Sequence, residues 1–451
     1  MLTRLILELL LLAQNAVLSL VALAIAGGRR LGRNPVRSIL VFRSGALGDF
    51  LMTVPTLSRL RRAHPDARIT LLTISTTHPD VAATKSTYTG RRDACPWVPF
   101  VVPSLVDEAF ILSPERPSRL VASARRMLRN ERFDVAVLLN DPGLSFGSVL
   151  RRMIFLRLAG VCGPVHGWRM QADLKFLRHT QYKAGRLPRR VEGLLRAIEQ
   201  LPTVTRRKDG RVDFPIRIDD ASISWADDHR RSLGVLGTRL VAIAPGALQP
   251  HKRWPIEKYA ELIAALLQAT DVHILLVGPP ADIELGKRLA VLDVARVHNS
   301  VGHTSLMQLA AILQHCTALI ANDGGAAHLG AALGLPVVAV IPGIEYPDSV
   351  EPWNSAHLAV RHSVECSPCY NFMDCPKKHY RCMKELSVEP VIRNALSVLG
   401  RTLPSSFVHT DTAQFVRDQP VHRSDSPAPA NLRSLSRFDQ VPGSTSAHPV
   451  V

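Results

Sequence analysis

Short apolar runs alternate along this chain with longer stretches in which apolar side chains recur every three or four residues. An uninterrupted apolar run predicts a strand that is buried on both faces, and the longer period predicts an amphipathic helix. The clearest pair is a strand at 39–42 and, after a glycine-containing turn, a helix with one apolar face: Leu51, Val54, Leu57 and Leu60. A strand, a tight turn and a helix form the repeating unit of a parallel sheet.

The same alternation continues over most of the chain. Further strands are predicted at 68–74, 105–112, 133–139, 239–244, 272–277, 318–321 and 337–341. Helices are predicted at 120–129, 148–158, 190–201, 221–233, 255–268, 283–291, 306–313 and 326–333. Strands and helices at this spacing indicate largely parallel, doubly wound sheets, so the predicted fold class is α/β.

Length and composition divide the chain into four parts. With 451 residues, 46% of them apolar, it can fill the cores of two α/β domains. We expect an apolar segment with a basic linker over 1–37, an N-terminal Rossmann-like domain over 38–211 and a C-terminal Rossmann-like domain over 212–400. Residues 401–451 are rich in Ser, Pro, Thr and Asp, and we expect this tail to be disordered.

Residues 5–26 form an apolar run that is long enough to cross a bilayer, which takes about 20 residues. Three interpretations compete: a cleaved signal peptide, an uncleaved membrane anchor, and a helix docked on the protein itself. Positive charges directly after an apolar run tend to remain in the cytoplasm, and such charges follow here at Arg29, Arg30, Arg33 and Arg37. The anchor is therefore favoured, with the next domain on the cytoplasmic side.

The chain carries 55 Lys and Arg against 38 Asp and Glu, a formal charge of +17. Such an excess points to an anionic partner, and nucleic acid, a membrane surface and a phosphorylated glycolipid all qualify. Aromatic residues make up only 5% of the chain, and no module interleaves aromatic and basic side chains to stack on bases. The membrane surface and the glycolipid are therefore favoured over nucleic acid.

The first candidate site is the turn after the strand at 39–42, which contains Ser44, Gly45, Gly48 and Asp49. Open α/β sheets bind ligands at the carboxyl ends of their strands. The glycines permit a tight turn and a close approach of the backbone to a ligand. Asp49 has two interpretations: it caps the following helix, or its carboxylate performs chemistry at the mouth of the sheet.

Two more candidates follow strands in the second half of the chain. Lys252, shortly before a helix opened by Pro255, could hold a phosphate as a point charge or remain an exposed loop charge. Asp282 could cap the helix that follows it or accept hydrogen bonds from a ribose.

The most informative turn follows the strand at 318–321 and contains Asp323, Gly324, Gly325 and His328. Paired glycines directly after a strand expose backbone N–H groups at a helix N-terminus, which is a seat for a diphosphate. Asp323 and His328 flank this seat. We therefore expect His328 to lie near the phosphates of a donor.

Four cysteines gather in one short polar segment, at Cys366, Cys369, Cys375 and Cys382. Four thiolates at such spacing fit a tetrahedral structural zinc, although a clean second Cys-x-x-Cys is missing. Bound zinc and reduced thiols both remain open, and a pair of disulfides is disfavoured for a cytoplasmic protein.

Taken together, these motifs resemble the signatures of glycosyltransferase family 9, the heptosyltransferases of lipopolysaccharide core synthesis. The resemblance rests on the turn at 43–49 with its downstream Thr53 and Pro55, and on three blocks: 252–255, 302–306 and 323–328. It extends over residues 38–393. It implies the GT-B fold, in which two Rossmann-like domains face each other across a cleft, the first taking the acceptor and the second the nucleotide-sugar.

By this resemblance, Asp49 would be the general base that removes a proton from the acceptor hydroxyl, on a cleft loop formed by residues 44–48. Lys252 and the N–H groups of Gly324 and Gly325 would stabilise the departing nucleoside diphosphate. Asp282, shorter than the glutamate expected there, would stand at the ribose contact. No catalytic metal or other cofactor is implied, and the cysteine segment would be a structural clasp.

The expected function is therefore an inverting transfer of a sugar, heptose from ADP-heptose foremost, onto a lipopolysaccharide core or related anionic glycolipid. The expected location is the cytoplasmic face of the inner membrane, with residues 5–26 as the anchor. Two alternatives from other classes remain: a nucleotide-sugar epimerase of the same fold, and a non-catalytic protein that binds glycolipid or nucleotide.

Overall fold

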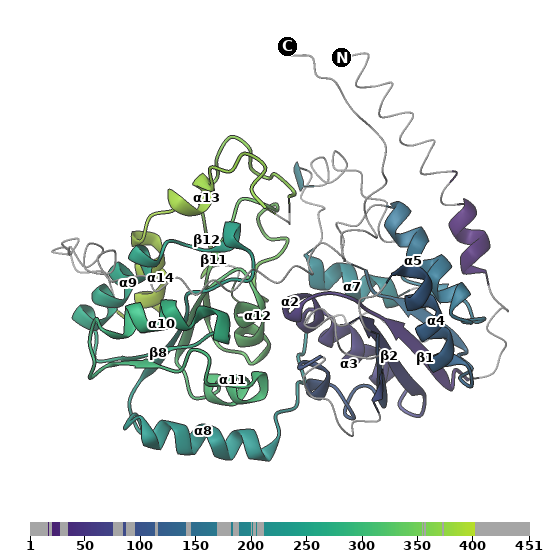
Figure 1. The fold of residues 1–451 in the computed structure, drawn as a ribbon, viewed down its shortest axis with the longest axis horizontal. Coiled ribbons are helices and arrows are strands. Elements are labelled where there is room, and N and C mark those ends of the chain that lie inside the picture. Colours follow the sequence, from purple (N-terminus) through teal and green to yellow (C-terminus); the bar gives the residue numbers. More distant parts are fainter. Residues whose placement is uncertain are drawn as a thin grey trace, which may run out of the picture.

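The computed structural model describes residues 17, 20–27, 35–74, 84–86, 95–112, 116–140, 146–168, 182–183, 189–199, 201, 204, 212–353, 355, 358–371 and 374–401. Over these ranges the chain forms two six-stranded sheets, each with helices packed against it, side by side in Figure 1. The predicted α/β class with two doubly wound, largely parallel sheets is confirmed. The sheets lie on either side of residue 212 in the sequence, while the domain boundaries themselves stay predictions.

The N-terminal sheet has the strand order β3-β4-β2-β1-β5-β6. Its strands are β1 (Ser38–Phe42), β2 (Arg68–Ile74), β3 (Thr84–Ser86), β4 (Glu108–Leu112), β5 (Val135–Leu138) and β6 (Val165–His166). All neighbouring pairs are parallel except β3 with β4. Strand β1 is central because its apolar run has helices on both faces to cover it.

The helices of this unit are α2 (Leu47–Leu51), α3 (Val54–Ala63), α4 (Pro117–Leu128), α5 (Phe146–Leu158) and α7 (Arg190–Ile198). The single helix predicted after the first turn was wrong: the structure has two, α2 and α3, separated at Met52 and Thr53. Pro55 explains the break, because it has no N–H to donate to the carbonyl of Leu51. Asp49 is thereby set on its own short helix.

The C-terminal sheet is wholly parallel, with the order β12-β11-β10-β7-β8-β9. Its strands are β7 (Leu240–Ala244), β8 (His273–Leu276), β9 (Val297–Asn299), β10 (Ala318–Asn322), β11 (Val337–Ile341) and β12 (Val360–Arg361). Its helices are α8 (Asp220–Ser232), α9 (Ile256–Ala269), α10 (Ile283–Ala290), α11 (Leu306–Leu313), α12 (Gly325–Ala332), α13 (Arg381–Lys384) and α14 (Glu389–Val398). The short strands β9 and β12 were not predicted, because two or three residues carry no detectable period.

Both sheets reverse their strand order beside the strand that opens them, between β1 and β5 and between β7 and β10. The crevice at such a switch point is where open α/β sheets bind ligands. The turns after β1, β7 and β10 contain most of the candidate residues from the sequence. The fold therefore directs them to two switch points.

Residues 20–26 are helical and pack on the N-terminal unit beside α5 (Figure 1). Ala22 and Ala26 are buried in the core cluster that includes side chains of α4 and α5. Arg157 of α5 donates from Nε to the carbonyl of Ile25 at 2.8 Å and from Nη2 to that of Ala26 at 3.1 Å. For these residues the docked-helix interpretation holds.

No helix within the described residues is long and apolar enough to cross a bilayer. Most of the apolar run at 5–26 and the tail beyond residue 401 lie outside the described residues, so the predicted anchor and the predicted disorder are not addressed.

We predict that Arg157→Gln loosens the docked helix. Arg157 also donates to the carbonyls of Val161 and Gly163, and glutamine cannot satisfy all four acceptors. The unfolding free energy should fall by about 2 kcal/mol, and amide exchange in residues 20–27 should become faster. Arg126→Gln, on the exposed face of α4, is the control. Unchanged exchange in Arg157→Gln would contradict the proposed clamp.

Candidate active site

The first turns of α2 and α12 meet where the two units are in contact (Figure 1). A Cβ atom on Gly48 would lie 2.7 Å from Cδ2 of His328, and one on Gly325 would lie 2.8 Å from Cδ2 of Leu47. Cβ atoms do not approach other atoms this closely, so each glycine provides the space for a side chain of the opposite unit. Two glycines of the predicted turns thus set the distance between the units.

Asp49 lies at the third position of α2, and its carboxylate faces both its own turn and the other unit. Its Oδ2 accepts from the N–H of Ala46 at 3.1 Å, so the capping interpretation holds. Its Oδ1 accepts from Nη1 of Arg190 at 3.0 Å. The side chain remains 26% exposed, so capping does not exclude contact with a substrate.

The turn before Asp49 is fixed by its neighbours. Gly45 has a φ of +150°, and a Cβ there would lie 2.7 Å from Cβ of Asp49, which explains the glycine. Arg43 is buried and donates from Nη2 to the carbonyl of Asp49 at 2.8 Å. Ser44 lies partly exposed in the same turn.

Lys252 is not an exposed loop charge: its Nζ donates to Oδ2 of Asp323 at 2.7 Å. His328 lies on the other side of Asp323, with Nε2 at 3.8 Å from Oδ1. Burial alone would raise the pKa of Asp323, but the ammonium of Lys252 and the ring of His328 outweigh it, and the pKa is lowered. Burial lowers the pKa of His328, although Asp323 and Asp49 favour its charged form.

Asn322, at the end of β10, joins the loops around this cluster. Its side-chain nitrogen donates to the carbonyls of Pro245 and Gly246 at 2.8 and 3.1 Å, and its oxygen accepts from the N–H of Trp254 at 3.1 Å. Sequence reasoning passed over Asn322, although its place before Asp323 at a strand end was a usable signal.

Asp282 does not cap its helix, and that interpretation was wrong: it stands at the N-cap of α10 without a side-chain capping bond. The carboxylate is buried instead beside Gly246, where an added Cβ would lie 1.8 Å from Oδ2. Burial raises the pKa of Asp282, although Arg253, 3.8 Å away, opposes the shift. The ribose interpretation remains a prediction.

Arg190 and Glu345 form a contact between the units that sequence reasoning missed. The guanidinium of Arg190, at the start of α7, bonds Asp49 through Nη1 and Oε1 of Glu345 through Nη2 at 3.1 Å. Glu345 follows β11 and its side chain is 3% exposed. One arginine among the many of the first half carried no signal for this role.

The family profile described as "Glycosyltransferase family 9 (heptosyltransferase)" matches residues 121–380, more than half of the chain. The chain belongs to glycosyltransferase family 9. The predicted family is therefore confirmed.

Among curated relatives of this family 9 chain, lipooligosaccharide heptosyltransferase 2 of Campylobacter jejuni is 29% identical over 168 residues, 36% of this chain and 52% of the relative. Lipopolysaccharide heptosyltransferase 3 of Escherichia coli is 25% identical over 386 residues, 81% of this chain and 97% of the relative. The chain spans about half the length of the first curated relatives that it matches.

Two solved structures show the same fold. The family 9 glycosyltransferase of Veillonella parvula has a TM-score of 0.58 at 20% identity and covers 81% of this chain and 98% of its own. E. coli ADP-heptose lps heptosyltransferase II has a TM-score of 0.52 at 21% identity, with 80% and 98% covered. The expected GT-B arrangement of this family 9 chain is thereby confirmed.

The four thiols of the cysteine segment are free, and His379 lies among them. One ring nitrogen of His379 faces Sγ of Cys366 at 3.7 Å and the other faces Sγ of Cys375 at 3.9 Å. Because one imidazole binds an ion through one nitrogen, both contacts cannot belong to one zinc ion. No group of three or more His, Cys, Asp and Glu side chains in the described ranges is arranged to hold a metal, so the zinc interpretation has no support.

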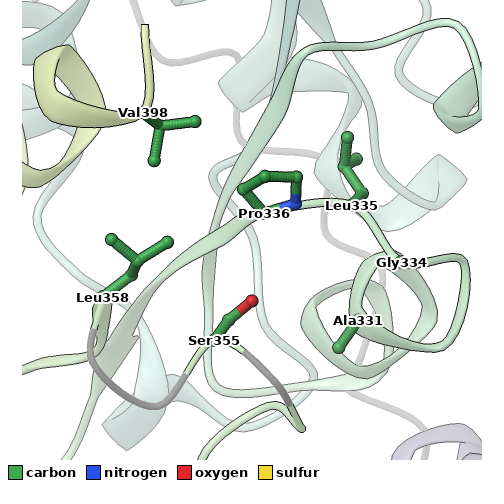
Figure 2. A pocket seen from close by; sticks show the side chains of 7 residues that line it. All are labelled: Ala331, Gly334, Leu335, Pro336, Ser355, Leu358 and Val398. Carbon is green, nitrogen blue, oxygen red and sulfur yellow. The ribbon is translucent and has the colours of Figure 1, made fainter. Parts of the chain in front are cut away.

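A cavity of about 280 Å³ lies elsewhere, at the C-terminal end of α12 (Figure 2). It is lined by Ala331, Gly334, Leu335, Pro336, Ser355, Leu358 and Val398. Its walls carry no ionisable side chain, and it opens beside the amino end of β11 rather than the carboxyl end. It is therefore not part of the candidate site.

We predict that Gly48→Ala lowers the transferase activity proposed below about tenfold or more while the protein stays folded, because the new methyl group must displace His328 and with it the contact between the units. Enzyme kinetics and thermal unfolding measure the two effects. Gly147→Ala is the matched control, since its Cβ would meet only Nη1 of Arg151, at 3.8 Å. Full activity in Gly48→Ala would show that the spacing of the units does not matter.

Proposed function

We propose that this family 9 chain is an inverting glycosyltransferase that moves heptose from ADP-heptose onto a lipopolysaccharide core or related anionic glycolipid. The observation that carries the proposal is the position of Asp49, on the N-terminal unit, opposite the cluster of Lys252, Asp323 and His328 on the C-terminal unit. The proposed base, Asp49, thus lies across the contact between the units from the proposed phosphate-binding site.

In the proposed reaction, Asp49 accepts the proton of an acceptor hydroxyl. The hydroxyl oxygen forms a bond to the anomeric carbon of the donor as the bond from that carbon to the phosphate oxygen breaks. The electron pair leaves with the nucleoside diphosphate. Attack opposite to the leaving group inverts the anomeric configuration.

The donor diphosphate would bind at the start of α12. The N–H groups of Gly324 and Gly325 lie at this helix N-terminus, where a negative charge is favoured. Lys252 would share its ammonium, which has three donors, between Asp323 and a phosphate oxygen. These groups supply positive charge where negative charge develops on the departing diphosphate in the transition state, and the proposed reaction uses no catalytic cofactor.

Asp282 would meet the ribose of the donor. Its buried carboxylate lies at the mouth of β8 beside the loop that leads to Lys252. The choice of ADP-heptose follows the name of the E. coli structure, ADP-heptose lps heptosyltransferase II.

A bilayer surface is the proposed place of reaction, on the cytoplasmic face of the inner membrane. Apolar side chains are exposed on the docked helix and on α5: Leu20, Leu23, Ile154 and Leu158 are 67, 43, 40 and 55% exposed. The adjacent α4 bears exposed arginines and neither α4 nor α5 contains an acidic residue. Apolar and basic side chains on these neighbouring helices match an anionic leaflet, which supports an anchor at residues 5–26 that lies in the membrane interface.

We predict that Asp49→Asn lowers acceptor-dependent nucleotide release at least a hundredfold, while the dissociation constant of the donor changes less than about twofold. The assay is a panel of ADP-, UDP- and GDP-sugars with and without deacylated lipopolysaccharide core. Lys252→Ala is the contrasting variant, because it should weaken donor binding instead.

Other outcomes of this assay would overturn the proposal. Product without any acceptor would indicate an epimerase. Donor binding without release from any pairing would indicate a binding protein. Full activity in Asp49→Asn would remove Asp49 as the base.

We also predict that the double variant Ile154→Asp with Leu158→Asp weakens binding to vesicles containing phosphatidylglycerol roughly tenfold, because each aspartate replaces an exposed apolar contact and repels the anionic surface. Co-sedimentation measures the affinity. Leu236→Asp with Val294→Asp, which alters exposed apolar residues of the C-terminal unit, is the control. Equal binding by both double variants would contradict the proposed face.

A further inference from the structure

Arg190 lies in the N-terminal unit but makes its contacts on both sides of the junction. Its helix, α7, packs against α3 and β5 of that unit. Its guanidinium spans from Oδ1 of Asp49 to Oε1 of Glu345, at 3.0 and 3.1 Å. Its backbone N–H also donates to the carbonyl of Ser349 at 3.0 Å.

Further contacts hold the residues around the Arg190 bridge in place. Glu345 belongs to a loop that Arg361 fastens, donating to the carbonyls of Pro342 and Glu345 and pairing with Glu351. The neighbouring Arg189 adds a second contact across the junction, with its guanidinium 4.9 Å from the ring centre of Trp353. A planar guanidinium reaches two carboxylates through two separate nitrogens in a fixed geometry, whereas the donors of an ammonium share one nitrogen.

We propose that Arg190 is the positioning residue for Asp49, and that Glu345 offsets part of the positive charge that Arg190 places beside Asp49. The bridge orients the carboxylate of Asp49 towards the donor site only while the units are in contact. The inference rests on the proposed function, because it assumes that Asp49 is the base. Arg190 acts through Asp49 and is not itself expected to touch the reacting atoms.

The bridge also limits the effect that the charge of Arg190 has on Asp49 as a proton acceptor. A lone guanidinium beside a carboxylate would favour the charged carboxylate and so weaken it as a proton acceptor. Glu345 shares the same guanidinium from the other side and offsets part of its charge. Two further charged or titratable groups lie near Asp49: His328 of α12, which is electrostatically coupled to Asp49, and Arg43 after β1, which donates to the backbone carbonyl of Asp49.

Loss of the charge of Arg190 and loss of the charge of Glu345 should therefore move the acid limb of the pH profile of kcat/KM in opposite directions. In Arg190→Gln the limb should move up by about 1 pH unit, because a cation beside the base is lost. In Glu345→Gln it should move down, because the cation is no longer offset. In both variants kcat should fall roughly tenfold, with the KM for the donor nearly unchanged.

Arg190→Lys separates charge from geometry. Its ammonium should hold the acid limb near the wild-type position, while kcat stays low because a single nitrogen does not span from Asp49 to Glu345 as Nη1 and Nη2 of Arg190 do. Arg196→Gln, on the same α7 helix, is the control for general effects on folding.

A double variant distinguishes this inference from the proposed function itself. If Arg190 works through Asp49, Arg190→Gln should cost little further activity in an Asp49→Asn background. Active Asp49→Asn would remove the base assignment. Inactive Asp49→Asn combined with acid limbs that stay still, or that move the same way in Arg190→Gln and Glu345→Gln, would overturn the positioning role alone.

Discussion

The close contact between α2 and α12 is the constraint on which the site depends. Two largely parallel sheets present their switch points to each other, but their helices can approach only because Gly48 and Gly325 lack side chains at the contact. A methyl group at either position would collide with His328 or Leu47 and separate the units. The spacing between the proposed base and the proposed phosphate site therefore depends on glycine at both of these positions.

Charge is arranged around this contact so that each ionic group has an opposite partner. On one side Glu345 faces Arg190, which faces Asp49, and on the other Lys252 faces Asp323, beside His328. Such pairing offsets the cost of burying charge. Burial lowers the pKa of His328, which lies beside Asp323. A diphosphate entering this region would find positive charge already oriented.

The first part of the chain adds a second theme, the relation of the site to a surface. Arg157 fastens residues 20–26 to α5, so the exposed side chains of both helices belong to one rigid body. Exposed arginines lie on the adjacent α4, which contains no acidic residue. A protein that acts on a lipid-linked acceptor benefits from such a face, because binding to the bilayer brings the site to its substrate.

The sequence by itself determined the α/β class, most of the strands and helices, the glycine turns after β1 and β10, and the family. These features are local, because the period of apolar residues, the ends of strands and the glycines of turns each depend on residues that are close together in the sequence. It also marked Asp49, Lys252 and Asp323, because each follows a strand end. It failed at the break between α2 and α3, at short strands, and at the capping role of Asp282, where side-chain direction decides.

Only the tertiary structure decided which of these residues meet. Asp49 and Arg190 are 141 positions apart, Arg190 and Glu345 are 155 apart, and Lys252 and Asp323 are 71 apart. No periodicity links such positions, since their contact follows from the strand order of two sheets and the packing of the sheets' helices. The sequence could name the candidate groups, and the fold brought together the arginine and the two carboxylates of the proposed bridge.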